Sequence, residues 1–318
     1  MNKIFITGGA GFIGSHICEK IFSDYKNAQV IILDKLTYAG NLFFLKNIIN
    51  SKRVKFIKSD IVNYKKYEKF LNNVDLVINV AAESHVDRSF QNSLLFTKTN
   101  TLGAHILIQK CIERNVKKII HISTDEVYGE ITKGSADESS TLNPTNPYSA
   151  SKAAAEIIIN SYRFYEKNKI ITVRGNNIYG IRQYPEKLIP TCICNLLMNK
   201  KIMISGDGSH LRCFLSVHDF ADAISLLVKE KTSGIFNIGN EREYKNLEIA
   251  KIVCALLGED PNKKIEFTKD RPFNDKRYSI KTNKIKKLGW RPKRSLIGDL
   301  PDIIKWYKEN LNLFYKKK

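Results

Sequence analysis

Short runs of aliphatic and β-branched residues alternate with stretches of helical periodicity along the first 175 residues. Six runs are expected to be strands, at residues 3–7, 30–33, 54–57, 76–80, 118–122 and 170–173. Between them, residues 12–23, 64–71, 93–114 and 146–168 carry apolar side chains at helical spacing. Strands that are apolar on both faces and alternate with helices are typical of a parallel sheet covered by helices. The pattern therefore predicts an α/β protein with a doubly wound parallel sheet.

The pattern loosens after residue 175, where proline and glycine divide the chain into shorter elements. We expect residues 1–175 to form the first domain and residues 176–318 to form mainly a smaller α/β domain over the carboxyl edge of the sheet. Part of the segment 215–238 is expected to return to the first domain. A chain of 318 residues, 43% of them hydrophobic, is long enough to bury both cores.

The formal net charge of +20 raises the question of a polyanionic partner. The lysines are scattered, however, and only short clusters occur, such as those in segments 284–287 and 316–318. Such clusters are more often solvated surface or a tail than a binding site. We therefore predict no specific nucleic-acid partner.

The chain has no run of the ~20 apolar residues that a membrane span requires, and its start does not resemble a secretory signal. The cysteines lack the paired spacing and neighbouring histidines of a metal site, and they show no disulfide framework. We expect a reduced, cytoplasmic protein without a metal site or a membrane contact, in which the cysteines are buried. They are Cys18, Cys111, Cys192, Cys194, Cys213 and Cys254.

Residues 4–15 give a strand, a glycine-rich turn and the start of a helix, in that order. Gly8 permits the tight turn, Gly11 lets the backbone approach a pyrophosphate, and Gly14 allows the helix to pack closely on the strand. The second strand then ends in Asp34, a carboxylate that can accept both ribose hydroxyls and repel a 2′-phosphate. This arrangement predicts a Rossmann-type NAD site, although Lys35 slightly weakens the preference for NAD over NADP.

Asp60, with Ile61, follows the third strand, where it can lie at the adenine edge or cap a helix. The fourth strand is followed by the polar loop 81–89, at the sheet edge where a ligand is expected. Asn100 in the next helix is a weaker candidate for a substrate contact. The expected cofactor contacts also include Phe12, Ile13, Thr37, Ala81, Ala82, Ser84, Tyr148 and Lys152, and the expected substrate contacts include Ser84, His85 and Asp87.

Tyr148 and Lys152 stand four residues apart at the start of a helix and therefore share one face. The ammonium of Lys152 is expected to lower the pKa of the phenol and make it a base near neutral pH. Such a pair occurs by chance in many helices. Together with the glycine turn and Thr124 at the end of the fifth strand, it resembles the extended branch of the short-chain dehydrogenase/reductase superfamily, over essentially the whole chain.

Asp125 and Glu126 follow Thr124 directly, and an extended backbone would direct their two carboxyl groups to different atoms of one sugar. The segment 124–129 contains the complete Thr-Asp-Glu-x-Tyr-Gly motif, and in this it resembles the nucleoside-diphosphate-glucose 4,6-dehydratases. Solvated surface carboxylates are the alternative interpretation.

The same resemblance implies substrate contacts in the second domain, with the arginine of the segment 206–212 on the diphosphate. The segments 174–177 and 286–290, together with Asn274, look like the eukaryotic branch that acts on UDP-glucose, whereas bacterial thymidine-linked enzymes generally have Gly-His at residues 273 and 274. This departure favours uracil over thymine. The implied contacts are Asn177, Lys187, Leu188, Arg212, Asn246, Arg271 and Asn274, besides Thr124.

The resemblance implies that NAD⁺ takes hydride from glucose C4 while Tyr148, supported by Lys152 and Thr124, removes the hydroxyl proton. Glu126 then takes the C5 proton, Asp125 protonates the departing C6 hydroxyl, and the hydride returns to C6. The product is a 4-keto-6-deoxyglucose nucleotide, used for rhamnose and related 6-deoxysugars.

Several alternatives remain open at this stage. With dTDP-glucose as the substrate the mechanism would be the same. A UDP-sugar 4-epimerase or a UDP-glucuronate decarboxylase shares the Tyr148 and Lys152 pair, and a basic nucleotide- or nucleic-acid-binding Rossmann protein would explain the charge. By resemblance we also expect a homodimer, formed through the helices at 93–114 and 146–168.

Overall fold

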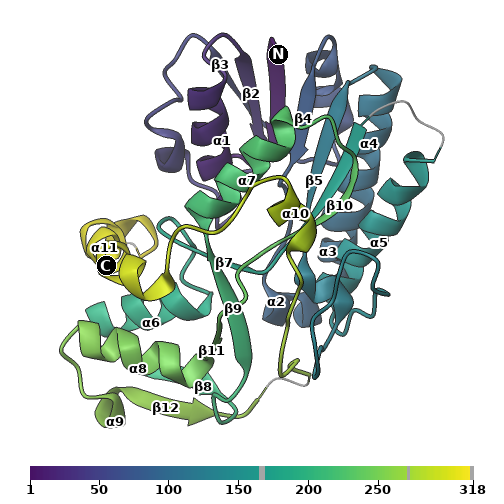
Figure 1. Ribbon diagram of the computed structural model, residues 1–318. Helices are drawn as coiled ribbons and strands as arrows, with labels where there is room; N and C mark the ends of the chain where they lie inside the picture. Colours follow the sequence, from purple (N-terminus) through teal and green to yellow (C-terminus); the bar gives the residue numbers. More distant parts are fainter. Residues whose placement is uncertain (165–168, 271–272, 316–318) are drawn as a thin grey trace.

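The computed structural model describes residues 1–164, 169–270 and 273–315 (Figure 1). Its main sheet has seven strands, and every neighbouring pair is parallel. The predicted doubly wound parallel sheet is therefore confirmed, and the strand order reverses between β1 and β4, where a ligand crevice forms in such sheets. The order is β10 (Gly234–Ile238), β6 (Lys169–Gly175), β5 (Lys118–Thr124), β4 (Leu76–Asn79), β1 (Lys3–Thr7), β2 (Gln29–Asp34) and β3 (Val54–Lys58).

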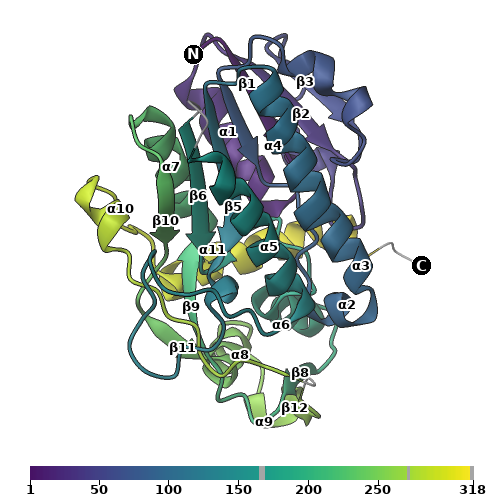
Figure 2. The same cartoon turned by 90° about the vertical axis from the view of Figure 1, so that its right-hand side faces the viewer.

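Helices cover both faces of this sheet (Figures 1 and 2). Alternate residues of each strand face opposite sides, so Ile4 and Ile6 pack on one layer of helices while Phe5 packs on the other. The first layer consists of α1 (Phe12–Asp24) and α7 (Val217–Lys229), and the second of α4 (Ala104–Glu113) and α5 (Pro147–Tyr162). Both α7 and β10 come from the segment 215–238.

Two of the predicted helices differ from the observed ones. The segment 64–71 forms two 3-10 turns, η2 (Tyr64–Lys66) and η3 (Glu68–Leu71), in place of one helix. The segment 93–114 is helical but contains a π-helical stretch, η4 (Thr97–Gly103), between α3 (Ser93–Phe96) and α4. The end of the last predicted helix, at residues 165–168, lies outside the described residues.

The remaining elements of the first part are short. They are η1 (Leu42–Leu45), α2 (Val86–Gln91) and η5 (Asp125–Tyr128). Because η5 follows β5 directly, it lies at the carboxyl edge of the sheet.

The second part of the chain packs against the carboxyl ends of the strands, below the sheet in Figure 1. Its core joins Ile193, Val253 and Ile303 from three helices. It contains a three-stranded sheet of β11 (Glu243–Lys245), β9 (Leu211–Ser216) and β7 (Asn177–Tyr179), and a pair of β8 (Ile202–Ser205) and β12 (Ile265–Thr268). Its helices are α6 (Leu188–Leu197), α8 (Asn246–Leu256), α9 (Pro261–Lys264), α11 (Leu296–Asn310) and η6 (Leu311–Leu313), whereas α10 (Asn283–Lys287) packs on β10 and places Ile285 in the core of the main sheet.

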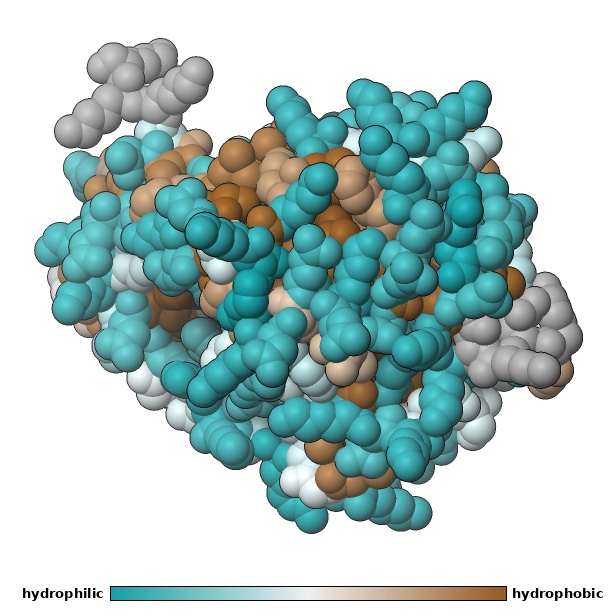
Figure 3. All heavy atoms as spheres, turned by 90° about the horizontal axis from the view of Figure 1, so that it is seen from above, coloured by the Kyte–Doolittle hydropathy of each residue, from teal (hydrophilic) through white to brown (hydrophobic). Residues whose placement is uncertain are grey.

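Further features of the fold are the burial of the cysteines and the polarity of the surface. All six cysteines are buried as free thiols, as predicted. Hydrophilic side chains cover most of the face seen in Figure 3, with smaller apolar areas between them. Within the described ranges, no helix has the length and apolar character needed to cross a membrane.

Candidate active site

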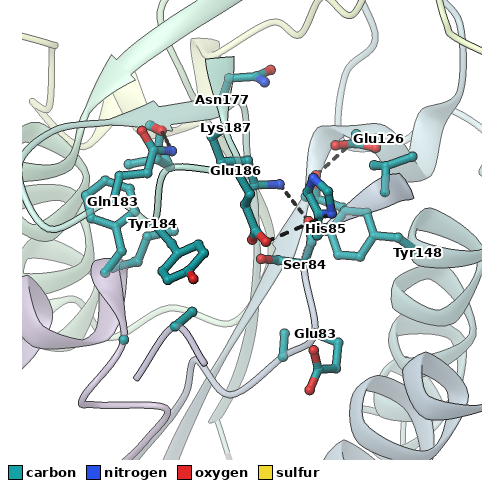
Figure 4. Close-up of a pocket in the computed structure, with 18 of the residues that line it drawn as sticks. Glu83, Ser84, His85, Glu126, Tyr148, Asn177, Gln183, Tyr184, Glu186 and Lys187 are labelled. Carbon is teal, nitrogen blue, oxygen red and sulfur yellow. Dashed lines mark hydrogen bonds and ion pairs between the residues drawn. The ribbon is translucent and has the colours of Figure 1, made fainter. Parts of the chain in front are cut away.

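A cavity of about 550 Å³ lies between the two parts of the chain, at the carboxyl edge of the sheet (Figure 4). It is lined by Gly8 after β1, Asp34 at the end of β2, Ser84 after β4 and Thr124 at the end of β5, and by Lys187 from the second part. The sheet therefore brings together residues from one end of the sequence to the other, as the order reversal at β1 and β4 requires.

The glycine turn has the shape of a dinucleotide cradle. Gly8 has φ +66°, and a Cβ there would lie 2.6 Å from the Ala81 nitrogen. A Cβ at Gly14 would lie 2.0 Å from the Gly8 carbonyl oxygen, so neither position tolerates a side chain. Gly11 is the N-cap of α1, and Phe12 and Ile13 line the cavity after it. The free N–H groups of this helix end can therefore meet an anion.

The carboxylate of Asp34 is held in place by two backbone groups. Its oxygens accept hydrogen bonds from the nitrogens of Ala10, at 2.9 Å, and Leu36, at 2.7 Å. Burial raises the pKa of Asp34, and these two hydrogen bonds act in the opposite direction. Asp34 and Thr37 both line the cavity, where the sequence predicted a ribose contact.

Lys35 and Asp60 form an ion pair beside Asp34, with Nζ 2.7 Å from Oδ2. The other oxygen of Asp60 accepts from the Val62 nitrogen at 3.1 Å, so this carboxylate both pairs with a lysine and supports the local turn. Burial acts to raise the pKa of Asp60, but the hydrogen bonds from Lys35 and Val62 outweigh it and the pKa is lowered. Asp60 and Ile61 line the same cavity.

The loop after β4 is supported from behind by Asn100, which is 1% exposed. Its side chain accepts from the Glu83 nitrogen at 2.8 Å and donates to the Glu83 oxygen at 2.9 Å. The expected substrate contact of Asn100 is therefore corrected, because its amide is used to position the loop. Ala81, Ala82, Ser84, His85 and Asp87, which this loop presents, do line the cavity.

Thr124 is the N-cap of η5, and its hydroxyl accepts from the Glu126 nitrogen at 3.3 Å. The backbone after β5 is thus a 3-10 turn, in contrast to the expected extended conformation. The two carboxyl groups still differ in environment, because Asp125 is buried and Glu126 is half-buried. Both line the cavity.

The two adjacent carboxyl groups have different electrostatic environments. Burial, followed by the charge of Glu126, raises the pKa of Asp125 to about 8, and its Oδ2 has no hydrogen-bond partner among the described residues. Burial also raises the pKa of Glu126, but the charges of Lys187 and Arg212 and a hydrogen bond from Asn146 oppose it. Asp125 is therefore protonated at neutral pH and suited to donate a proton, whereas the cations beside Glu126 favour its ionised form.

The thermal stability of an Asp125→Asn variant tests the raised pKa of Asp125. Between about pH 4 and pH 8 the folded wild type binds a proton at Asp125 that the unfolded chain releases, so its stability falls as the pH rises. The variant lacks this loss. Scanning calorimetry gives the melting temperature of the variant minus that of the wild type, and we expect this difference to be larger at pH 8 than at pH 5. An equal difference at both pH values would contradict the assignment.

Tyr148 and Lys152 lie on one face of α5, which starts at a capping box formed by Asn146 and Ser149. Burial raises the pKa of Tyr148, the charge of Glu126 adds to this, and a hydrogen bond with Thr124 opposes it. Lys152 Nζ donates to the Ile122 oxygen at 2.6 Å. Burial is the main cause of the raised Tyr148 pKa, and the expected lowering of this pKa by Lys152 stays a prediction.

Burial raises the pKa of Tyr148 but lowers the pKa of Lys152, to about 8. The charge of Glu156, one turn further along α5, opposes this decrease. Lys152 is therefore charged for the most part at neutral pH, as a group that stabilises a phenolate should be.

The substrate-side residues gather around the guanidinium of Arg212. It donates to the Asp275 oxygen at 2.8 Å and to Asn274 Oδ1 at 3.2 Å, and it stacks on the Tyr278 ring at 4.6 Å. Arg271 lies outside the described residues. The other predicted substrate contacts of the second part line the cavity, namely Asn177, Lys187, Leu188, Arg212, Asn246 and Asn274.

The sequence did not identify several residues of this site. Asn146 donates to Glu126 Oε2 at 3.3 Å, and its position before Pro147 could have marked it as a helix cap, but not as a partner of Glu126. Glu83 lines the cavity as a buried carboxyl group. Glu186, which is half-buried beside the predicted Lys187, also lines the cavity, and Figure 4 shows it directed toward His85. No local motif indicated these contacts, because each joins segments far apart in the sequence.

The sheet, the glycine cradle and the pair of Tyr148 and Lys152 at its carboxyl edge define an extended short-chain dehydrogenase/reductase. The family model described as GDP-mannose 4,6 dehydratase matches residues 5–298. The chain therefore belongs to this family of nucleotide-sugar dehydratases.

Relatives of two kinds match nearly the whole chain. The dTDP-D-glucose 4,6-dehydratase of Bos taurus is 41% identical over 319 residues, covering 98% of this chain and 90% of the relative. A trifunctional UDP-glucose 4,6-dehydratase of Arabidopsis thaliana, which is also a 3,5-epimerase and a reductase, is 40% identical over 315 residues. The match covers 97% of this chain but only 47% of that relative, so the chain spans about half its length.

Solved structures with the same fold include both dehydratases and epimerases. DesIV, the dTDP-glucose 4,6-dehydratase of Streptomyces venezuelae solved with NAD, has a TM-score of 0.95 at 37% identity and 99% coverage of both chains. A UDP-glucose 4-epimerase of Thermotoga maritima has a TM-score of 0.89 at 28% identity, covering 97% of this chain and 99% of that one.

Proposed function

We propose that this protein dehydrates a nucleoside-diphosphate-glucose to the 4-keto-6-deoxyglucose derivative, with UDP-glucose favoured over dTDP-glucose. The observation that carries the proposal is the adjacent pair of Asp125 and Glu126 in the cavity, with the pKa of Asp125 raised to about 8. Elimination of water needs an acid and a base close together, and their unequal environments provide both.

The cofactor that fits the cradle is NAD. Gly8 and Gly14 leave no room for side chains, the start of α1 can receive the pyrophosphate, and Asp34 can accept the ribose hydroxyls. When bound, NAD⁺ supplies the hydride acceptor and later the hydride donor, and its positive charge favours the phenolate of Tyr148. NAD is thus regenerated in each turnover.

The protein side chains have separate roles in this proposal. Tyr148 removes the proton of the sugar C4 hydroxyl, and the ammonium of Lys152 and the hydroxyl of Thr124 stabilise its ionised form. Glu126 removes the C5 proton, which the 4-ketone has made acidic, and returns a proton to C5 when the hydride is delivered to C6. Asp125 donates its proton to the departing C6 hydroxyl.

The preference for UDP-glucose rests on the resemblance of Asn274 and its surroundings to the UDP-glucose branch, and relatives of both kinds support the shared reaction. We would supply UDP-glucose and dTDP-glucose in parallel to purified protein without added reductant. Initial rates of water loss, followed by mass spectrometry, give the preference. Faster loss from dTDP-glucose would reverse it, and loss from neither sugar would exclude the dehydratase.

Separate measurements distinguish the other candidates. An epimerase would change the configuration of the sugar with no change of mass, and a decarboxylase would release CO₂ from UDP-glucuronate. A nucleic-acid-binding protein would retain RNA at physiological salt when saturated with NAD.

Selection of NAD over NADP is expected to depend on the pair of Lys35 and Asp60. Asp60 forms an ion pair with the ammonium of Lys35, and the charges of Asp34 and Asp60 together make this end of the cavity negative overall. Asp60→Asn is expected to strengthen NADP binding about tenfold, because it removes one charge and frees Lys35 for a 2′-phosphate. Calorimetric titration of both cofactors measures this. Lys35→Gln is the matched control, and it should abolish the gain when combined with Asp60→Asn.

A homodimer is expected to form through α3, η4, α4 and α5, which pack together on one face of the sheet (Figure 2). Leu94, Leu102 and Ile157 are 80%, 49% and 62% exposed there. We expect Ile157→Glu to yield monomers in light scattering after gel filtration, because a charge would be buried in the interface. Leu256→Glu, an equally drastic change at an exposed residue of α8, should leave the dimer intact. A monomeric wild type would contradict the prediction.

A further inference from the structure

Residues 180–187, called the crossing loop here, join β7 to α6 and pass along the edge of the cavity. Gln183, Tyr184, Glu186 and Lys187 of this loop line the cavity, and in Figure 4 Glu186 and Lys187 extend toward His85 and Ser84. The loop thus belongs to the second part of the chain but borders the cofactor side of the site.

The first end of the crossing loop is attached to α1. Arg182, with φ +70° and 9% exposure, directs its guanidinium back to the first part of the chain. It lies 3.3 Å from Ser15 Oγ and 2.9 Å from Glu19 Oε2. Because α1 begins at the glycine cradle, this contact fixes the loop relative to the cradle.

The second end is attached to two loops of the first part through Glu186. Its Oε1 accepts from the Tyr38 hydroxyl at 3.0 Å, and its Oε2 lies 3.9 Å from His85 Nδ1. Tyr38 follows β2 and His85 follows β4. Lys187, next to Glu186, donates to the Ser84 oxygen at 2.6 Å.

The ring of Tyr38 is held between two further side chains. The Arg88 guanidinium stacks on it at 3.8 Å, and Tyr184 meets it edge to face at 5.0 Å with an interplanar angle of 89°. Tyr38 is therefore fixed in the orientation that its hydrogen bond to Glu186 needs.

We propose that Tyr38 and Glu186 are positioning residues that hold the crossing loop closed over a bound dinucleotide and slow its release. The inference rests on the proposed function for the identity of the dinucleotide as NAD. Gly8 and Asp34 of the cradle line the same cavity as Gln183 and Tyr184 of the crossing loop, and the hydrogen bond from Tyr38 to Glu186 joins the crossing loop to the segment that follows Asp34. A cofactor that is regenerated in each turnover does not have to leave, so slow release is compatible with catalysis.

The rate of NAD release tests this proposal. Tyr38→Phe removes one hydrogen bond and is expected to speed release about threefold, and Glu186→Ala removes the contacts to both loops and is expected to speed it about tenfold. The double variant should release NAD no faster than Glu186→Ala alone, because both changes break the same contact. Release is followed by rapid mixing of the holoenzyme with excess labelled NAD.

Glu113→Ala, which removes an exposed ion pair with Lys110 on α4, is the matched control and should release NAD at the wild-type rate. Wild-type release rates in both single variants, or fully additive effects in the double variant, would overturn the proposal. Tyr38→Phe keeps the test decisive if Glu186→Ala lowers the melting temperature. A wild-type protein that binds no NAD would instead contradict the proposed function, before any variant is compared.

Discussion

Asp125→Asn and Glu126→Gln are each expected to slow dehydration by about 10²–10⁴-fold while NAD binding is retained. Asp125→Asn leaves no proton to donate to the departing hydroxyl, and Glu126→Gln leaves no base for the C5 proton. Neither change affects the base at C4, so both variants should still oxidise the sugar. Reduced nicotinamide, observed by its absorbance, should therefore accumulate in each variant with the sugar bound.

Solvent exchange separates the roles of the two carboxyl groups. In deuterated water, Asp125→Asn retains Glu126 and should exchange the C5 hydrogen of the oxidised sugar, whereas Glu126→Gln should not. Asp137→Asn, which changes a half-buried carboxylate outside the cavity, is the matched control and should turn over normally. If either catalytic-site variant turned over like the wild type, its assigned role would be wrong.

Arg174→Met is expected to destabilise the fold by about 3–5 kcal/mol, because it leaves the carboxylate of Glu156 buried without its cation. The two side chains are 2% and 0% exposed, and Nη2 lies 2.7 Å from Oε2. Arg174 Nη1 also donates to the Tyr128 hydroxyl at 2.7 Å, and Ser123 donates to the second oxygen of Glu156. The network thus connects β6, α5 and the segment that carries Asp125.

Urea unfolding of the holoenzyme and of the NAD-free protein measures this loss. The double variant Arg174→Met with Glu156→Leu should recover much of the stability, since no unpaired charge remains. Lys201→Ala removes an ion pair of which both partners are about half exposed, and it should change the stability little. A loss in Arg174→Met as small as that in Lys201→Ala would show that the buried pair is not needed.

Six of the seven strands of the main sheet could be predicted from the sequence, because short apolar runs that alternate with helical stretches are typical of a covered parallel sheet. The seventh strand, β10, was not among the predicted strands. Gly8 and Gly14 could be predicted for a similar reason, since the turn excludes any side chain. The motif around Asp125 and Glu126 was local too. The backbone conformation of this motif was not predicted correctly, because Thr124 caps a 3-10 turn where an extended segment was expected.

The environment of the site residues was decided by the tertiary structure. The pKa of Tyr148 depends on how completely other segments exclude water from it, and burial here outweighs the hydrogen bond with Thr124. Asn100 was expected to contact the substrate, but it lies behind the loop after β4, where its amide forms hydrogen bonds with the backbone of Glu83.

The sequence by itself determined the doubly wound sheet, the dinucleotide cradle and the pair of carboxyl groups, because local pattern and steric exclusion act over a few residues. Only the tertiary structure decided which distant side chains meet, as Tyr38 and Glu186 do across 148 residues of chain. The order of the strands determines which loops are neighbours, and burial determines which side chains of those loops are ionised. Neither property is encoded in any single segment.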